Sequence, residues 1–387
     1  MDAVESGPAS GKLLLVDLDK SALRDDGTFG PATIAFFQEA HEAGNELVVV
    51  TARYVSSTIK LLNQHQGCVS AIFGMHGAQV AFWERDSRRY VDRYAREVAR
   101  MHYTSERRID EQAMGAQADR WAVEHGDPRV FLSRAAMRDV REVSLRALNG
   151  HIAEHNSRQP SNPLTPLEDV YFAVRAGAGN RLHQEGFQWR DPKNAGNRDE
   201  GTVTWQEMLD TCTASGWEPP IKPALKMMLD PGSEITAAQT ADVINGYMRA
   251  RGRRTEWQIR SSGAHCEIFH RDLGKELCVS EAQLEFGIDR QDSYYLGDAG
   301  ADVEPMKLCG HALMPSNHTI TLAQRREIEE AGAVIHLCGS NDAEGPAKRF
   351  RGLLNMPGPS APQFFPTGRF HISQSSDRRS GSPRRKP

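Results

Sequence analysis

Acidic residues stand directly after apolar runs in two places far apart in the chain. Asp17 and Asp19 follow the apolar residues 13–16, and Asp298 and Asp302 follow a second apolar run. Carboxylates can attack phosphorus, transfer protons and bind a hard cation through oxygen. Four of them in one crevice would repel one another unless a cation neutralised them, which indicates Mg²⁺. These residues therefore predict metal-assisted phosphoryl transfer.

Asp17 is the predicted nucleophile, and Asp19 is the predicted general acid and base. Attack by the Asp17 carboxylate on phosphorus would form an aspartyl-phosphate and split hydrolysis into two easier displacements. Asp19 would protonate the leaving group and then deprotonate the attacking water, a role typically worth about 10²–10⁴-fold in rate. The expected reaction is the hydrolysis of a phosphomonoester.

Two more side chains have the chemistry that a phosphate group needs. Thr51 ends another apolar run and offers a hydroxyl and a backbone N–H to a phosphoryl oxygen, although a threonine there would equally cap a helix. Lys275 begins a helix-like stretch and would supply positive charge to the phosphoryl group. Lys222 and Lys226 compete with Lys275 for this role.

A doubly wound parallel α/β sheet would position these residues. Its expected strands are continuous apolar runs, typical of parallel strands buried on both faces, and helix-like stretches separate them. In such a sheet, ligands bind at the carboxyl ends of the strands, where the acidic residues stand. The expected strands are residues 13–16, 47–50, 71–73, 293–296, 311–314 and 333–337, and the expected helices are residues 32–43, 56–66 and 275–286.

The middle of the chain has a different character. Residues 84–269 begin with a long charged stretch and continue with short strand-like and helix-like pieces, which indicates an inserted α+β cap. The α/β core is then expected to consist of residues 1–83 and 270–356. Residues 357–387 are rich in Pro, Ser, Gly and Arg, so a disordered tail is predicted. The elements expected in the cap are helices at residues 134–148 and 237–249, and strands at residues 170–174, 226–229, 256–259 and 266–269.

The composition points to a small-molecule substrate. A formal net charge of −4, from 47 basic and 51 acidic residues in 387, gives no field strong enough to favour nucleic acid or a membrane surface as partner. The six cysteines form no C-x-x-C pair, so neither a zinc site nor a disulfide framework is expected. We expect no signal peptide and no membrane span, and a cytoplasmic location. The sequence indicates no oligomeric state.

The motifs together resemble the haloacid dehalogenase (HAD) superfamily. The resemblance extends to the branch of Cof-type and sucrose-phosphate-phosphatase-like enzymes, whose Asn-Gly-Ala segment is similar to His76-Gly77-Ala78. Lys20 and Ser21 stand where the family usually has a small residue and then Thr. The four motifs are Asp17-Leu18-Asp19, Val49-Val50-Thr51-Ala52-Arg53, Lys275 and Gly297-Asp298-Ala299-Gly300-Ala301-Asp302.

The resemblance implies a magnesium-dependent phosphatase with a cap that closes over the site and selects the substrate. A small phosphorylated metabolite, in particular a sugar phosphate, is the implied substrate. A phosphomutase and a catalytically weak binding or regulatory protein of the same fold remain alternatives. The implied roles are nucleophile for Asp17, acid and base for Asp19, phosphate binding for Thr51, Ala52 and Lys275, and metal binding for Asp17, Asp298, Asp302 and the backbone of Asp19. Arg53 and His76 are candidate substrate contacts, although Arg53 would equally pair with a carboxylate and a lone histidine is more often a surface or core residue.

Overall fold

The computed structural model describes most of the two α/β stretches and part of the insert. The predicted tail and Lys222 lie outside the described residues, as does the side chain of Lys226. Among the helices of the described ranges, none combines the length and the hydropathy that crossing a membrane requires. The described residues are 11–92, 134–167, 170, 172–177, 184–188, 224–229, 235–262 and 265–356.

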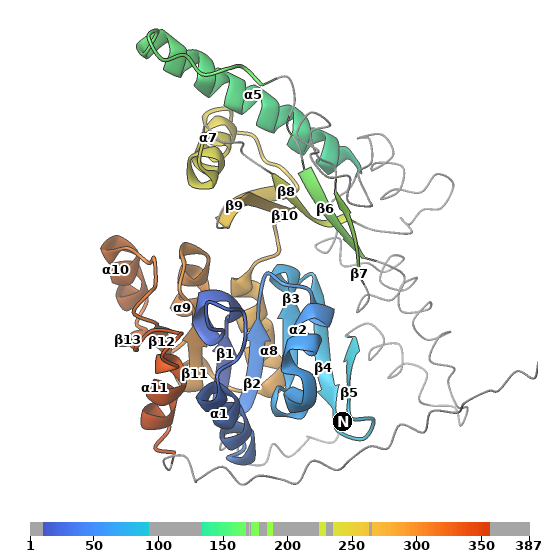
Figure 1. The fold of residues 1–387 in the computed structure, drawn as a ribbon, viewed down its shortest axis with the longest axis vertical. Coiled ribbons are helices and arrows are strands. Elements are labelled where there is room, and N and C mark those ends of the chain that lie inside the picture. The colour runs from blue at the N-terminus through green and yellow to red at the C-terminus, as the bar shows by residue number, and fades with distance from the viewer. Residues whose placement is uncertain are drawn as a thin grey trace, which may run out of the picture. The chain divides into compact units, whose positions relative to one another are not determined.

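An eight-stranded sheet forms the α/β core, in the order β13-β12-β11-β1-β2-β3-β4-β5 (Figure 1). Its first six strands pair in parallel, and all six were expected from their apolar runs. The strands β4 and β5, which the sequence did not predict, extend the sheet in antiparallel fashion. The strands are β1 (Leu13–Val16), β2 (Glu46–Val50), β3 (Ala71–Gly74), β4 (Gln79–Glu84), β5 (Arg89–Asp92), β11 (Ser293–Leu296), β12 (His311–Met314) and β13 (Val334–Leu337).

Helices cover both faces of this sheet. Successive strand residues point to opposite faces, so Leu14 belongs to one hydrophobic core and Leu15 to the other, and both are fully buried. The first core includes residues of α1, α2 and α11, and the second includes residues of α8, α9 and α10. The helices are α1 (Pro31–Glu42), α2 (Val55–Leu62), α8 (Lys275–Phe286), α9 (Val303–Lys307), α10 (Leu322–Glu330) and α11 (Gly345–Leu353).

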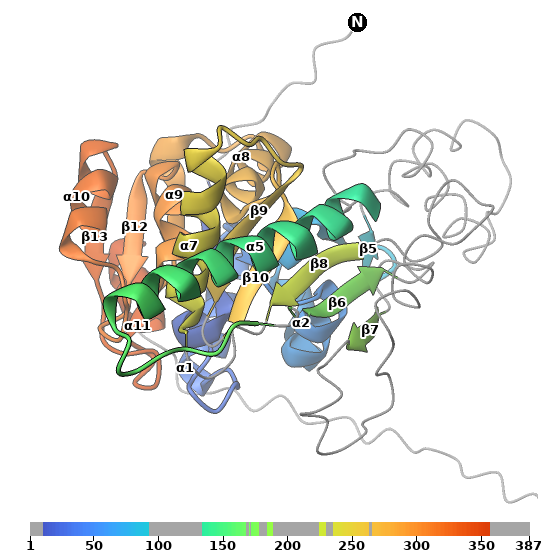
Figure 2. The ribbon, with the colours of Figure 1, turned by 90° about the horizontal axis from the view of Figure 1, so that it is seen from above.

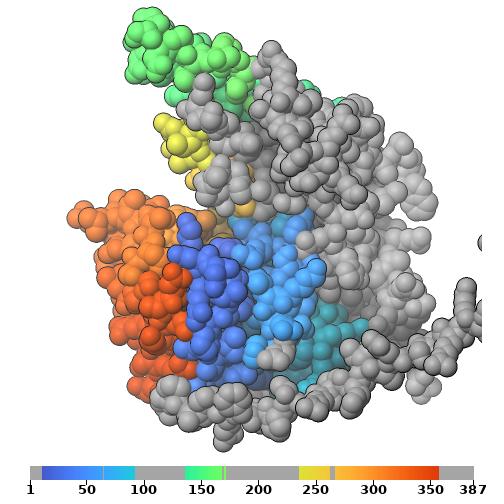
Figure 3. Space-filling view, in the orientation of Figure 1, coloured from blue at the N-terminus to red at the C-terminus, as the bar shows by residue number. Residues whose placement is uncertain are grey.

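The order of the strands creates a topological switch point between β1 and β11. From β1 the chain continues to β2 and β3 on one side, and it returns to β11, β12 and β13 on the other. The parallel register pairs Val16 with Leu296, so β1 and β11 end at the same level. Figure 3 shows the N-terminal and C-terminal segments, in blue and in orange to red, side by side on one face. A ligand site is expected at the carboxyl ends of these two strands.

The insert contributes a five-stranded antiparallel sheet, in the order β7-β6-β8-β10-β9. The helices α5 and α7 pack on it around a separate hydrophobic core that includes Met137, Ile244 and Trp257 (Figure 2). The core sheet continues to Asp92, past residue 83, so we propose that the insert begins after β5. These elements are α5 (Arg134–Arg158), β6 (Phe172–Gly177), β7 (Gln184–Gln188), β8 (Ala224–Leu229), α7 (Ala237–Ala250), β9 (Trp257–Ser262) and β10 (His265–His270).

Candidate active site

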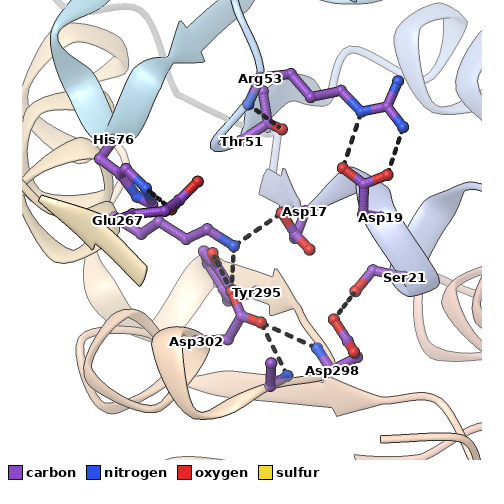
Figure 4. Close-up of polar contacts among 12 residues, drawn as sticks. Asp17, Asp19, Ser21, Thr51, Arg53, His76, Glu267, Tyr295, Asp298 and Asp302 are labelled. Carbon is purple, nitrogen blue, oxygen red and sulfur yellow. Dashed lines mark hydrogen bonds and ion pairs between the residues drawn. The ribbon is translucent and has the colours of Figure 1, made fainter. Parts of the chain in front are cut away.

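Three carboxylates and one lysine meet at the switch point (Figure 4). Asp17 follows β1, Asp298 and Asp302 follow β11, and one oxygen from each lies within 4.8 Å of the others. Lys275 Nζ donates hydrogen bonds to Asp17 Oδ1 at 2.8 Å and to Asp302 Oδ1 at 2.7 Å. All four residues are buried. The structure therefore brings together four of the residues that the motifs singled out.

The loop after β11 holds Asp302 in a fixed position. Its Oδ2 accepts the backbone N–H groups of Asp298 and Ala299, both at 3.1 Å, and its Oδ1 accepts the hydroxyl of Tyr295 at 3.0 Å. A Cβ on Gly297 would lie 2.4 Å from Asp302 Cγ. Only glycine therefore fits at this position, because the carboxylate packs directly on its backbone.

The charges of this cluster do not balance by themselves. With all groups ionised, three carboxylates and one lysine leave a net charge of −2 in a buried site. Burial raises the pKa of Asp17 to about 7, against the opposing charge of Lys275, and burial with the nearby Asp302 raises the pKa of Asp298 to about 6. For Lys275, burial lowers the pKa but the charges of Asp17 and Asp302 outweigh it and raise the pKa. A divalent cation bound by these oxygens would neutralise the cluster, so the residues fit Mg²⁺.

Asp19 faces a different partner. Arg53 Nε donates to Asp19 Oδ2 at 2.8 Å, and Arg53 Nη2 donates to Asp19 Oδ1, so both carboxylate oxygens are engaged. Its side chain remains 54% exposed and does not join the buried cluster. Three of the four expected carboxylates thus converge, and any role of Asp19 in metal binding falls to its backbone.

The two residues after Asp19 are set by a left-handed backbone at Lys20 and by a hydrogen bond from Ser21. Lys20 adopts the left-handed region with φ +57°, where glycine is favoured, and Asn317 Nδ2 donates to its carbonyl at 3.0 Å. This conformation suits glycine better than lysine. The buried hydroxyl of Ser21 donates to Asp298 Oδ1 at 3.3 Å. Ser21 is therefore a site contact that sequence reasoning noted only as a departure.

Thr51 is buried at the end of β2, but one of its expected contacts is already used. Its backbone N–H donates to the Phe73 carbonyl at 2.9 Å, since the pairing of β2 with β3 continues one residue past the strand. The expectation that this N–H serves a phosphoryl oxygen is therefore wrong. The hydroxyl oxygen of Thr51 accepts the N–H of Arg53 at 3.1 Å, which leaves its own hydrogen to donate. Ala52 lies between these two residues in the loop.

His76 lies close to the cluster, and its imidazole binds a residue that the sequence did not single out. Its Nε2 lies 2.6 Å from Glu267 Oε2, and both side chains are buried, at 3% and 5% exposure. The imidazole also stacks on Phe269 with ring centroids 4.3 Å apart. One feature of the sequence could have pointed to Glu267: it is a charged residue inside the apolar run 266–269.

Comparison with known proteins agrees with the expected family. Residues 14–162 match the family model of the haloacid dehalogenase-like hydrolases. No curated protein matches the chain in sequence. The match agrees with the expected family and enzyme class, and it covers the first α/β stretch and part of the insert.

Solved structures confirm the fold class. A phosphatase of the haloalkanoate dehalogenase superfamily from Bacteroides thetaiotaomicron is 13% identical, with a TM-score of 0.52, and the match covers 92% of this chain and 98% of that one. A protein from Streptococcus mutans is 12% identical with a TM-score of 0.53, covering 89% and 100%. A subclass IIB sugar phosphatase is also 12% identical, with a TM-score of 0.51 and the same coverage. At these identities the likeness shows the fold alone.

Proposed function

We propose that this haloacid dehalogenase-like hydrolase is a magnesium-dependent phosphatase that acts on a small phosphorylated metabolite through an aspartyl-phosphate. The observation that carries the proposal is the buried cluster of Asp17, Asp298, Asp302 and Lys275 at the switch point. A carboxylate nucleophile, oxygen ligands for a hard cation and a fixed positive charge are the three features that phosphoryl transfer to an aspartate requires.

Asp17 is the proposed nucleophile, and Lys275 is its proposed electrostatic partner. Attack requires the ionised carboxylate, which burial disfavours and Lys275 favours. Asp17, Asp298, Asp302 and the backbone of Asp19 would hold Mg²⁺, which when bound offsets the charge of the transferring phosphoryl group. Lys275 and the hydroxyl of Thr51 would then bind the phosphoryl oxygens.

Asp19 is the proposed general acid and base, and it has to leave Arg53 to act. Both of its oxygens accept hydrogen bonds from the guanidinium, so neither is in place to protonate a leaving group. We infer that the pair opens when substrate binds. Arg53 pairs with a carboxylate here, which was one of its two expected roles, and once released it would take the other and contact the substrate.

The proposed substrate class is a sugar phosphate. Its support is the likeness in fold to the subclass IIB sugar phosphatase. A small substrate is also consistent with the modest net charge of the chain.

The first test is phosphate release from a panel of sugar phosphates, nucleotides and an aryl phosphate, with magnesium. The wild type should release phosphate, and Asp17→Asn should release none while keeping its fold, because the amide fills the same volume but cannot act as the nucleophile. Chelation should stop the reaction and magnesium should restore it. Transfer of phosphate within a substrate without release would support the phosphomutase instead, and full activity in Asp17→Asn would remove Asp17 from its role.

A further inference from the structure

One short turn connects the two segments that are proposed to bind phosphate. It spans residues 75–77 between β3 and β4, and its central residue is His76. The His76 N–H donates to the carbonyl of Thr51 at 3.3 Å, and the His76 carbonyl accepts the N–H of Gly274 at 3.0 Å. Gly274 immediately precedes Lys275. The turn is therefore hydrogen-bonded both to the Thr51 loop and to the residue that precedes α8.

The backbone of the turn is in an unfavourable conformation. Met75 and His76 both lie in the left-handed region, with φ of +52° and +58°. Such residues persist only when their surroundings hold them in place. Histidine and asparagine tolerate the region better than most residues, which accounts for His76 at the place of the family's asparagine. The turn thus depends on contacts from elsewhere in the fold.

Glu267 supplies one such contact from β10. The Glu267 carboxylate accepts a hydrogen bond from His76 Nε2 at 2.6 Å, and the imidazole stacks on Phe269 from the same strand. Both members of the pair are buried, so the bond is shielded from water and removal of one partner leaves the other without it. Residues 271–274 then lead from β10 directly into α8 and Lys275.

We propose that His76 and Glu267 form a positioning pair for the phosphate subsite. Neither residue touches the substrate; Glu267 holds His76, and the turn around His76 holds Thr51 and Lys275 at the separation that a phosphoryl group needs. The inference rests on the proposed function, and it assigns to His76 a role other than substrate contact. It also predicts that the strand returning from the insert controls the geometry of the core site.

The direct test measures the binding of inorganic phosphate to the magnesium-loaded protein by calorimetry, together with phosphate release. Glu267→Ala should weaken phosphate binding and lower kcat/KM by about 100-fold, the loss expected from a displacement of about 1 Å. Glu267→Gln keeps an oxygen that accepts the Nε2 hydrogen bond, so it should restore most of both. The melting temperature is measured in parallel to separate a positioning role from a general loss of stability.

A matched control comes from the neighbouring strand. Arg260 on β9 forms an ion pair with Glu276 of α8 at 2.8 Å, and its guanidinium carbon lies 5.6 Å from the centre of the Phe269 ring, but it is not a member of the His76–Glu267 pair. Arg260→Ala removes an ion pair that joins β9 to α8, leaves the His76–Glu267 hydrogen bond in place and should leave phosphate binding unchanged. His76→Asn breaks the pair from the other side while tolerating the left-handed backbone. It should reproduce the loss of Glu267→Ala, and the double variant should lose little more.

Three outcomes would overturn the inference. These are unchanged phosphate binding in Glu267→Ala, an equal loss in Arg260→Ala, and a fall in melting temperature with no loss of phosphate binding at a temperature where the variant is folded. Failure of Glu267→Ala to fold leaves His76→Asn to decide by the same readout. Failure of the proposed function is distinguishable, because the wild type would then release no phosphate from any substrate, whereas phosphate binding still reports on the pair.

Discussion

At the scale of single residues, Asp17 and Asp19, the two carboxylates with proposed catalytic roles, differ in their surroundings. Asp17 is buried beside Lys275, while Asp19, two residues further on, is half exposed and paired with Arg53. A buried carboxylate next to a lysine suits nucleophilic attack, and an exposed one that can change partner suits proton transfer. The structure thus gives physical grounds for assigning different roles to two similar residues.

Asp19→Asn tests the role in proton transfer. It should lower kcat by about 10²–10⁴-fold on a sugar phosphate, whose alkoxide leaving group needs a proton. The loss should be much smaller on p-nitrophenyl phosphate, because nitrophenolate leaves without one. The measurement is kcat of the wild type and the variant on each of the two substrates. Asp26→Asn, a change in an exposed loop, serves as the control. An equal loss on both substrates would assign Asp19 to another step.

At the scale of elements, the ends of β1 and β11 determine where the clustered carboxylates lie. Val16 and Leu296 are paired in register, and the residue after Val16 continues the pairing through the N–H of Asp17 and the carbonyl of Leu296 at 2.9 Å. The loop after β11 then turns tightly enough to bring Asp302 back against Gly297. The carboxylates meet because two strands far apart in the sequence end at the same level.

Gly297→Ala tests this packing. The added methyl group would lie 2.4 Å from Asp302 Cγ, so the carboxylate has to move away from Lys275 and from the other proposed metal ligands. Magnesium affinity and kcat/KM should both fall, as measured by calorimetry and by phosphate release. Gly300→Ala in the same loop meets only a flexible Gln324 side chain at 3.3 Å and should have little effect. Wild-type magnesium affinity in Gly297→Ala would show that Asp302 does not bind the metal.

At the scale of the whole molecule, we expect the buried carboxylates to couple stability to pH and to the proposed metal binding. The pKa of Asp17 is raised to about 7 and that of Asp298 to about 6, from a usual value of 3.8. Without metal, the folded protein therefore binds more protons than the unfolded chain between the usual and the raised pKa values. The free energy of unfolding should fall as the pH rises through this window.

Magnesium should reverse this loss, because it binds the ionised carboxylates. Its effect on the melting temperature should be larger at about pH 8 than at about pH 5, where protons compete for the same oxygens. Melting curves with magnesium and with chelator at the two pH values make the test. Asp17→Asn should reduce the difference. An equal magnesium effect at both pH values would contradict the assignment of these carboxylates as ligands.

The sequence by itself determined the parallel strands of the core, the acidic residues at their ends and the resemblance to a family. Apolar runs and helix signals are local properties, so β1, β11 and α8 were predicted at the residues where they occur. Strand-end positions then follow from the topology of a doubly wound sheet. The antiparallel β4 and β5 were not predicted.

Only the tertiary structure decided which partner each polar side chain binds. Asp19 faces Arg53 instead of the cluster, the N–H of Thr51 is used by Phe73, and His76 binds Glu267, 191 residues away. A hydrogen bond between buried groups depends on distance and direction in space, and neither can be read from spacing along the chain. The four members of the buried cluster were therefore accessible from the sequence, while their contacts and the parts of Ser21 and Glu267 required the fold.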